Sequence, residues 1–374
     1  MRPLREMTEE QLRQRTSLKW TEYPPDVLPM WVAEMDVEPP EPVRRALTGL
    51  LERGDVGYPQ SGHYLAAFAD FASARWGWTP SAAAGLEVAD VMTGVRIAIE
   101  LCTSPGGPVV ISPPVYPPFF GVVAWSGRRL ETAPLGNDGR LDLDRLDTVL
   151  GRVGPGAAYV LCSPHNPTGT VHTRAELEAV ARIAAERGAR VVVDEIHAPL
   201  VRTGFVPFLS VAGSERAYVA TSASKGFNLA GLKAGLVFAG PEAADELGAL
   251  PPLAGHGASQ FGLAAHVAAV SEGREWLDAL VGDLEENRAV LGELLSTHLP
   301  DVRWMRGSGG YLAWLEFPAA LGDDPAARIL DRARVALNSG LPFGEGGRRH
   351  ARLNYATTPE LLEAGIARIA AAMR

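Results

Sequence analysis

Short runs of apolar residues alternate with helical patterns between about residues 85 and 240 of the chain. The runs are 109–111, 159–162, 191–193, 218–220 and 236–238. Because they are continuous, with no alternation of apolar and polar residues, they predict strands that are covered on both faces. We therefore expect an α/β fold in which helices flank a mainly parallel sheet.

The clearest helical pattern spans residues 174–187 and connects two of these expected strands. Thr173 and Glu176 have the spacing of a capping box, in which each side chain bonds the backbone of the other. Gly188 stands where a helix commonly ends. This segment predicts a crossover helix between parallel strands.

The pattern changes towards the C-terminus. Residues 260–298 are mainly helical, and the strand-like segment 311–317 then opens a different region. We expect a smaller C-terminal α/β domain beside the larger one. The predicted division is a large domain at 41–274, a small domain at 275–374, and an N-terminal segment, 1–40, that packs on the small domain.

Composition narrows the possible partners and location. The 374 residues are 47% hydrophobic, enough for one large core and a second, smaller one. A formal charge of −9 argues against nucleic acid and anionic membranes as partners. The chain has no apolar stretch of about 18 residues and no targeting pattern. Cys102 and Cys162 provide neither a disulfide framework nor a zinc site, and no metal is expected, so we predict a cytoplasmic protein.

Polar clusters directly follow four of the expected strands. They occupy residues 112–116, 163–169, 194–197 and 222–225. In an open α/β sheet a ligand binds at the carboxyl ends of the strands. We therefore expect the four clusters to meet at one pocket.

Lys225 and Asp194 are the most informative residues of these clusters. Lys225 lies among small hydroxyl residues and glycines, where it could be desolvated and act as an amine nucleophile. It could equally be a strand-end lysine whose ammonium reaches water. Asp194 is costly to bury without a cationic partner, although it could simply cap a turn. Together the two suggest a cofactor with a carbonyl and a protonatable ring nitrogen, such as pyridoxal phosphate (PLP).

The order and spacing of these motifs over nearly the whole chain resemble the fold-type I PLP enzymes, the aspartate aminotransferase superfamily. The segments that carry the resemblance are Ser-Pro-His-Asn-Pro-Thr-Gly at 163–169, Asp-Glu-Ile-His at 194–197, Ser-Ala-Ser-Lys at 222–225 and Arg-Leu-Asn-Tyr at 352–355. Residues 31–36 and 311–315 are similar to the MalY and PatB branch of cystathionine β-lyases. Glu34 departs from that branch, which more often has Asp.

The resemblance implies a role for each pocket residue. Lys225 would hold the cofactor covalently and then move the Cα proton, while Asp194 would pair with the ring nitrogen. Asn166 would bond the phenolic oxygen, Tyr116 would stack on the ring, and His197 would lie near the phenolic oxygen. From local sequence alone, Asn166 is a turn residue, Tyr116 could be a core aromatic, and His197 could bond a backbone carbonyl.

The resemblance also implies a phosphate site and a carboxylate site. The protein groups expected to bind the phosphate are the backbone N–H groups of Gly94 and Val95, the hydroxyls of Ser222 and Ser224, the ammonium of Lys233, and Tyr58, which would reach across a homodimer interface. Arg352 would bind the substrate α-carboxylate, with Ala33 also contacting the substrate. Tyr58 in isolation could be a turn aromatic, and Arg352 a surface arginine like its neighbours.

The reaction implied by the branch is carbon–sulfur β-elimination from L-cystathionine or a cysteine S-conjugate, giving a thiol, pyruvate and ammonia. An aminotransferase is the alternative, and a binding protein that has lost turnover is less consistent with the retained site residues. A dinucleotide site is poorly supported, because 307–310 is the wrong context for its glycine motif. The sequence does not predict which side chain the substrate carries: Tyr64, Trp125 and His256 could line a substrate pocket or could pack in the protein without contacting the substrate.

Overall fold

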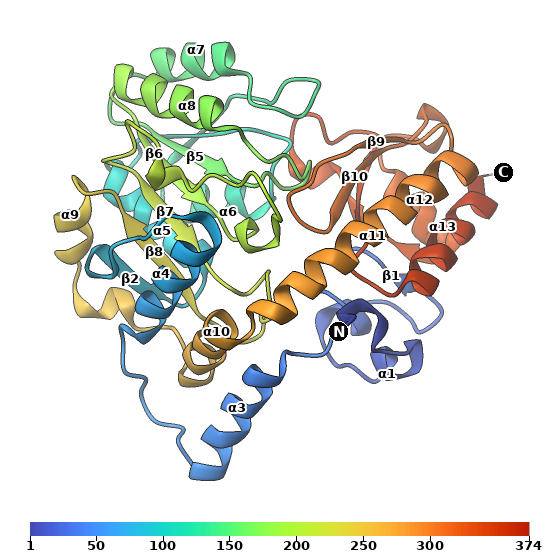
Figure 1. The fold of residues 1–374 in the computed structure, drawn as a ribbon. Helices are drawn as coiled ribbons and strands as arrows, with labels where there is room; N and C mark the ends of the chain where they lie inside the picture. The colour runs from blue at the N-terminus through green and yellow to red at the C-terminus, as the bar shows by residue number, and fades with distance from the viewer. Residues whose placement is uncertain (374) are drawn as a thin grey trace.

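A computed structural model describes residues 1–373, and a seven-stranded sheet forms the centre of its larger part (Figure 1). The strands, in order across the sheet, are β2 (Gly85–Val88), β8 (Gly235–Ala239), β7 (Tyr218–Thr221), β6 (Arg190–Asp194), β5 (Ala158–Cys162), β3 (Pro108–Ile111) and β4 (Arg129–Thr132). Strands β7 to β4 run parallel, whereas β8 is antiparallel to both of its neighbours. The expected α/β fold with a mainly parallel sheet is confirmed, and each of the five apolar runs lies in a strand.

Helices cover both faces of this sheet, which explains the continuous apolar runs. On β5, Val160 packs with the core under α5 (Val91–Cys102) and α6 (Pro118–Trp125). Its neighbour Leu161 packs with the core under α7 (Leu143–Val153) and α8 (Arg174–Glu186). Successive side chains of a strand point to opposite faces, so both positions must be apolar.

Helix α8 has the predicted ends. The Glu176 N–H donates to Thr173 Oγ1 at 3.2 Å, and the Thr173 N–H donates to Glu176 Oε2 at 2.7 Å. Gly188 follows the helix with φ +66°, a left-handed conformation that favours glycine. The crossover between β5 and β6 is therefore fixed by residues visible in the sequence.

The C-terminal part contains a smaller, antiparallel sheet. Its strands, in order, are β12 (Asn338–Ser339), β13 (His350–Asn354), β10 (Leu312–Glu316) and β9 (Arg303–Met305). The helices beside it are α11 (Arg274–His298), α12 (Pro325–Ala333) and α13 (Pro359–Met373). The helical pattern over 260–298 is two helices, α10 (Gln260–Glu272) and α11, which Gly273 separates. The expected strand at 311–317 is β10.

The N-terminal segment lies against this C-terminal part (Figure 1). It contains α1 (Glu9–Arg13), α2 (Leu18–Thr21) and β1 (Leu28–Pro29). Strand β1 pairs in parallel with β11 (Val335–Ala336), and the Leu4 N–H donates to Asp283 Oδ2 on α11 at 3.0 Å. The domain boundaries at 40/41 and 274/275 stay a prediction.

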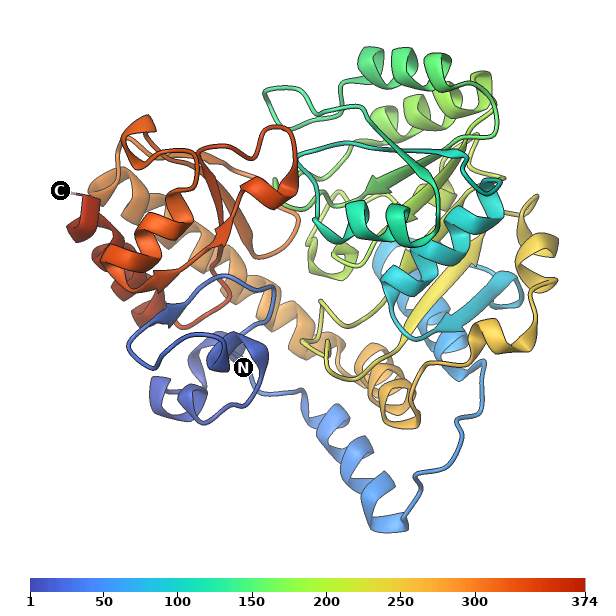
Figure 2. The same ribbon diagram turned by 180° about the vertical axis from the view of Figure 1, so that it is seen from behind.

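Helix α3 (Glu41–Arg53) packs against α10, and its far end projects from the body of the molecule before a loop at 54–62 returns the chain to α4 (His63–Trp76) (Figure 2). Tyr58 in this loop is fully exposed, with the apolar side chains of Leu51 and Val56 exposed beside it in sequence. The remaining helices are α9 (Ala244–Gly248) and the 3-10 turns Pro3–Arg5, Ala82–Ala84, Ala198–Leu200, Phe208–Ser210, Pro252–Gly255, Ala319–Leu321 and Leu341–Phe343. Within residues 1–373, no helix combines the length and apolar character needed to cross a membrane.

Candidate active site

The four polar clusters meet because the strands before them are neighbours. Strands β3, β5, β6 and β7 are adjacent and parallel, so their carboxyl ends share one edge of the sheet. A cavity of about 190 Å³ opens at this edge. Of the residues predicted for the site, those that line it are Ala33, Tyr116, Asn166, Asp194, His197, Ser222, Ser224, Lys225 and Lys233.

Lys225 points into the cavity from the turn after β7. Its Nζ donates to Ala33 O at 2.7 Å, so the ammonium is held by a backbone carbonyl and does not reach into bulk water. Burial, and then the positive charge of Arg352, lower the pKa of Lys225 to about 8. A measurable fraction of the side chain is thus a neutral amine at neutral pH.

Asp194 ends β6 and also lines the cavity. Its Oδ1 accepts the Ile196 N–H at 3.0 Å, so it caps the following turn as well as facing the cavity. Burial raises the pKa of Asp194 to about 6, which Lys225 partly opposes. The carboxylate is buried and ionised at neutral pH, an arrangement that a cationic ligand group would stabilise.

His197 follows the same strand and is held neutral. Burial lowers the pKa of His197 to about 3, and the charges of Lys225 and Arg352 act in the same direction. Its Nδ1 is buried and has no hydrogen-bond partner among the described residues. The ring lies 6.1 Å from that of Tyr311. His197 therefore lines the cavity as a neutral imidazole ring.

Arg352 fixes the orientation of Asn166. It is 3% exposed, and its Nη1 donates to Asn166 Oδ1 at 3.0 Å. Because a guanidinium only donates, the amide oxygen of Asn166 faces the arginine and its Nδ2 is left for another acceptor. A second nitrogen of Arg352, Nη2, donates to Trp31 O at 3.3 Å, while Nε is unpaired within residues 1–373. The alternative that Arg352 is a surface arginine is wrong, because its side chain is buried and its Nε is still free to donate a hydrogen bond.

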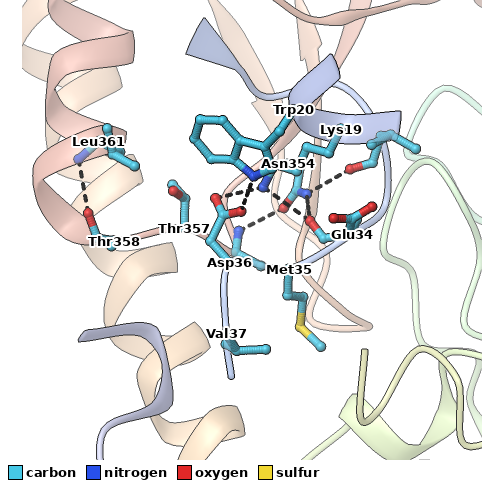
Figure 3. Close-up of polar contacts among 12 residues, drawn as sticks. Lys19, Trp20, Glu34, Met35, Asp36, Val37, Asn354, Thr357, Thr358 and Leu361 are labelled. Carbon is cyan, nitrogen blue, oxygen red and sulfur yellow. Dashed lines mark hydrogen bonds and ion pairs between the residues drawn. The ribbon is translucent and has the colours of Figure 1, made fainter. Parts of the chain in front are cut away.

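Ala33 lines the cavity as part of residues 31–36, which we call the 31–36 loop. Besides Lys225, the hydroxyl of Tyr311 donates to Ala33 O at 3.1 Å. Asn354 Nδ2 donates to Val32 O at 2.8 Å and to Glu34 O at 2.6 Å from β13 (Figure 3). The position of Ala33 is therefore set from the small sheet and from the cavity floor at once.

The other end of the loop is held by charge. Lys19 Nζ lies 2.7 Å from Asp36 Oδ2, and both side chains are 1% exposed. Trp20 Nε1 donates to the other oxygen of Asp36 at 3.0 Å, and Lys19 also donates to Glu34 O at 3.2 Å (Figure 3). The N-terminal segment thus anchors the 31–36 loop with a buried ion pair.

The phosphate end differs from the prediction at Gly94 and Val95. The Gly94 N–H donates to Asp90 O at 3.1 Å as part of α5, so it is not free for an anion, and neither residue is among the described residues that line the cavity. A Cβ at Gly94 would lie 2.7 Å from Val237 Cγ2, so this glycine allows close packing of helix on sheet. Val91 and Met92, one turn earlier, line the cavity instead.

The four other residues predicted to bind the phosphate, Ser222, Ser224, Lys233 and Tyr58, differ in their positions. Lys233 Nζ lies 3.0 Å from Asp90 Oδ2 at the rim, with its side chain 57% exposed. Ser222 Oγ donates to Ala234 O at 2.8 Å and accepts the Ser224 N–H at 3.1 Å. Tyr58 is not among the described residues that line the cavity.

Met92 and Lys19 are site features that the motifs did not reveal, and Tyr311 lay within the 311–315 segment of the resemblance without a role assigned to it. Tyr311 stood in the expected strand but carried no chemical signal, and Lys19 looked like part of a charged surface segment. Asp90, the N-cap of α5, was the signal that would have located the correct helix start.

The chain has close relatives among known proteins. The model of the family Aminotransferase class I and II matches residues 33–369. A protein of Mycobacterium leprae, provisionally named a cystathionine beta-lyase, is 47% identical and covers 99% of this chain and 98% of its own length. The cystathionine beta-lyase of Corynebacterium glutamicum is 35% identical, covering 97% of this chain and 98% of its own.

Solved structures agree with the sequence relatives. A Corynebacterium diphtheriae protein, provisionally described as a PLP-dependent β-cystathionase, superimposes with a TM-score of 0.93 at 32% identity, covering 100% of this chain and 98% of that one. The aspartate aminotransferase-like fold that the motifs implied is confirmed. The chain belongs to the aminotransferase class I and II family.

Proposed function

We propose that the protein is a PLP-dependent carbon–sulfur β-lyase that converts L-cystathionine or another cysteine thioether, with water, to a thiol, pyruvate and ammonia. The observation that carries this proposal is one cavity lined by the low-pKa amine of Lys225, the carboxylate of Asp194 and Asn166, whose amide oxygen accepts from the buried guanidinium of Arg352. The names of the relatives support the choice of reaction.

The cavity residues fit the cofactor. Bound PLP would supply an aldehyde for covalent attachment of an amine and a protonated ring that withdraws electrons from the substrate Cα. Asp194 would pair with the ring nitrogen, Asn166 Nδ2 would donate to the phenolic oxygen near His197, and Tyr116 would lie on the ring face. The start of α5 with Ser222, Ser224 and Lys233 would receive the phosphate.

Three groups would act on the substrate. The Arg352 guanidinium, with its unpaired Nε, would bind the α-carboxylate and so fix which bond of Cα faces Lys225. Lys225, as the neutral amine, would take the Cα proton. Ala33 O would hold the resulting ammonium of Lys225 close to the reacting carbon, as it holds Nζ at 2.7 Å in the structure.

The experiment is a pyruvate assay of the PLP-loaded enzyme on cystathionine and a panel of cysteine thioethers, with Lys225→Ala as the inactive control. Stoichiometric thiol and pyruvate without any added oxo acid are expected. The second candidate is an aminotransferase, because the family model is that of aminotransferases. Turnover only with an added 2-oxo acid, and a pyridoxamine absorbance on adding an amino acid, would favour that reaction and refute the lyase.

We also propose a homodimer in which Tyr58 of one subunit contacts the cofactor phosphate of the other. The full exposure of Tyr58, beside exposed Leu51 and Val56 on a projecting arm, supports this arrangement. Mixing Tyr58→Phe with Lys225→Ala subunits tests it, because a hybrid dimer then has one intact site. About a quarter of all sites should be active after random exchange, and no recovery would refute the shared site.

Free, buried Cys102 and Cys162 support a cytoplasmic location.

A further inference from the structure

The turn that carries Lys225 is held from beneath by two side chains of other elements. The Ala223 N–H donates to the hydroxyl of Tyr64, on α4, at 2.8 Å. That hydroxyl lies 3.0 Å from Nδ1 of His266, on α10. Tyr64, His266 and Ala223 are all 0% exposed. The described residues that line the cavity include neither Tyr64 nor His266.

The direction of each hydrogen bond follows from the outermost acceptor. His266 Nε2 lies 3.0 Å from Leu232 O, and a carbonyl only accepts, so Nε2 carries the hydrogen. Nδ1 of the neutral ring is then an acceptor and takes the Tyr64 hydroxyl hydrogen. The Tyr64 oxygen is left to accept from the Ala223 N–H. Burial lowers the pKa of His266 to about 4, which agrees with a neutral imidazole.

The contact falls at a sensitive point of the chain. Ala223 separates Ser222 from Ser224 and precedes Lys225 by two residues, so a shift of its backbone would move three groups of the site together. An N–H buried at this depth would be costly without an acceptor, and Tyr64 supplies one. The series of hydrogen bonds from Leu232 O through His266 and Tyr64 to Ala223 therefore holds the 222–225 turn at a fixed distance from α4 and α10.

We propose that Tyr64 and His266 are positioning residues that preorganise the 222–225 turn to receive the phosphate and the aldehyde of PLP. The inference rests on the proposed function, since it assumes that this turn binds that cofactor. Neither side chain touches the reacting atoms. Their contribution is to spare the cofactor the cost of ordering the turn when it binds.

The test compares cofactor binding by four variants. PLP is titrated into the apo-protein and its Kd is measured by absorbance, after circular dichroism has shown that each variant is folded. Tyr64→Phe should weaken PLP binding about tenfold, because it leaves the Ala223 N–H unpaired and His266 Nδ1 with only the Ser222 hydroxyl, 3.4 Å away. KM for the amino-acid substrate of the loaded enzyme should stay unchanged, because Arg352 and Ala33 lie on other elements.

His266 supplies a conservative rescue, and Tyr218 a matched control. His266→Asn keeps an acceptor near the Nδ1 position and should bind PLP nearly as the parent does, whereas His266→Leu should resemble Tyr64→Phe. Tyr218→Phe removes another hydroxyl of a buried tyrosine, one that bonds Glu246 at the opposite end of β7, and should leave the Kd unchanged.

Each outcome bears on one proposal. Equal PLP affinity of Tyr64→Phe and the parent, or an equal loss in Tyr218→Phe, would overturn the positioning role. If Tyr64→Phe does not fold, the two His266 variants decide, and equal affinity of the Asn and Leu forms would overturn it. Failure of the unmodified protein to bind PLP would instead refute the proposed function.

Discussion

Replacing Lys19 with methionine should lower the free energy of unfolding by about 3–5 kcal/mol, because it leaves a buried carboxylate without its cation. Asp36 is 1% exposed and would keep only the Trp20 Nε1 donor, at 3.0 Å. Its Oδ2 would lose the ammonium that lies 2.7 Å away. Methionine has nearly the length of the lysine stem, so the change removes charge with little loss of packing.

The magnitude comes from burial. An exposed ion pair contributes about 0.2–1 kcal/mol, since water and salt screen it. Arg182 and Glu186 form such a pair on α8, with side chains 60% and 54% exposed. Arg182→Met is therefore the matched control and should cost less than about 1 kcal/mol.

The assay is equilibrium unfolding in urea followed by circular dichroism, with Trp fluorescence as a second probe. Removing both charges, in Lys19→Met with Asp36→Leu, should restore most of the stability, because an uncharged pair needs no solvation. A loss below about 1 kcal/mol in Lys19→Met, equal to that of Arg182→Met, would refute the reasoning. The reasoning would also fail if the double variant lost as much unfolding free energy as the two single variants together, or more.

Three further results are expected. Gly262→Ala should lower the free energy of unfolding by about 1–3 kcal/mol in a thermal melt, because its Cβ would collide with the Lys233 carbonyl. Gly282→Ala, where the added Cβ meets no neighbour, is the control and should raise that free energy by about 0.5–1 kcal/mol. Equal effects of the two substitutions would contradict this. Arg352→Lys should raise KM for the amino-acid substrate about 10- to 100-fold in steady-state kinetics. The lysine ammonium lacks the planar guanidinium that can donate to Asn166 Oδ1 and to the substrate carboxylate at once. An unchanged KM would exclude Arg352 as the residue that binds the carboxylate. The rate of PLP capture by apo-protein should rise with pH and level off above about pH 8, because only the neutral Lys225 amine attacks, and a stopped-flow midpoint near 10.5 would show an unperturbed lysine.

The sheet was readable from the sequence because buried parallel strands leave an unbroken apolar signal. The runs at 159–162 and 191–193 became β5 and β6, and the polar residues after them met at one edge. The antiparallel direction of β8 left no such signal, since Leu236–Phe238 is apolar in either direction.

Long-range partners were beyond the sequence. Lys19 and Tyr64 are an ordinary lysine and an ordinary aromatic residue until the fold brings Asp36 and His266 against them. The error at Gly94 has a local cause, because its glycine suggested a phosphate loop whereas it serves close packing on Val237. Roles that depend on which atom is left unpaired, such as Nε of Arg352, require coordinates.

The parallel pairing of β1 with β11 has a consequence for biosynthesis. Pro29 leaves the ribosome 307 residues (336 − 29) before its partner Ala336. At about 5–20 residues per second this delay is roughly 15–60 s. Throughout that time Leu28, which is buried in the finished protein, lacks its strand partner Val335. Strand β1 thus completes its pairing long after it is synthesised, and chaperones and proteases can meet it first.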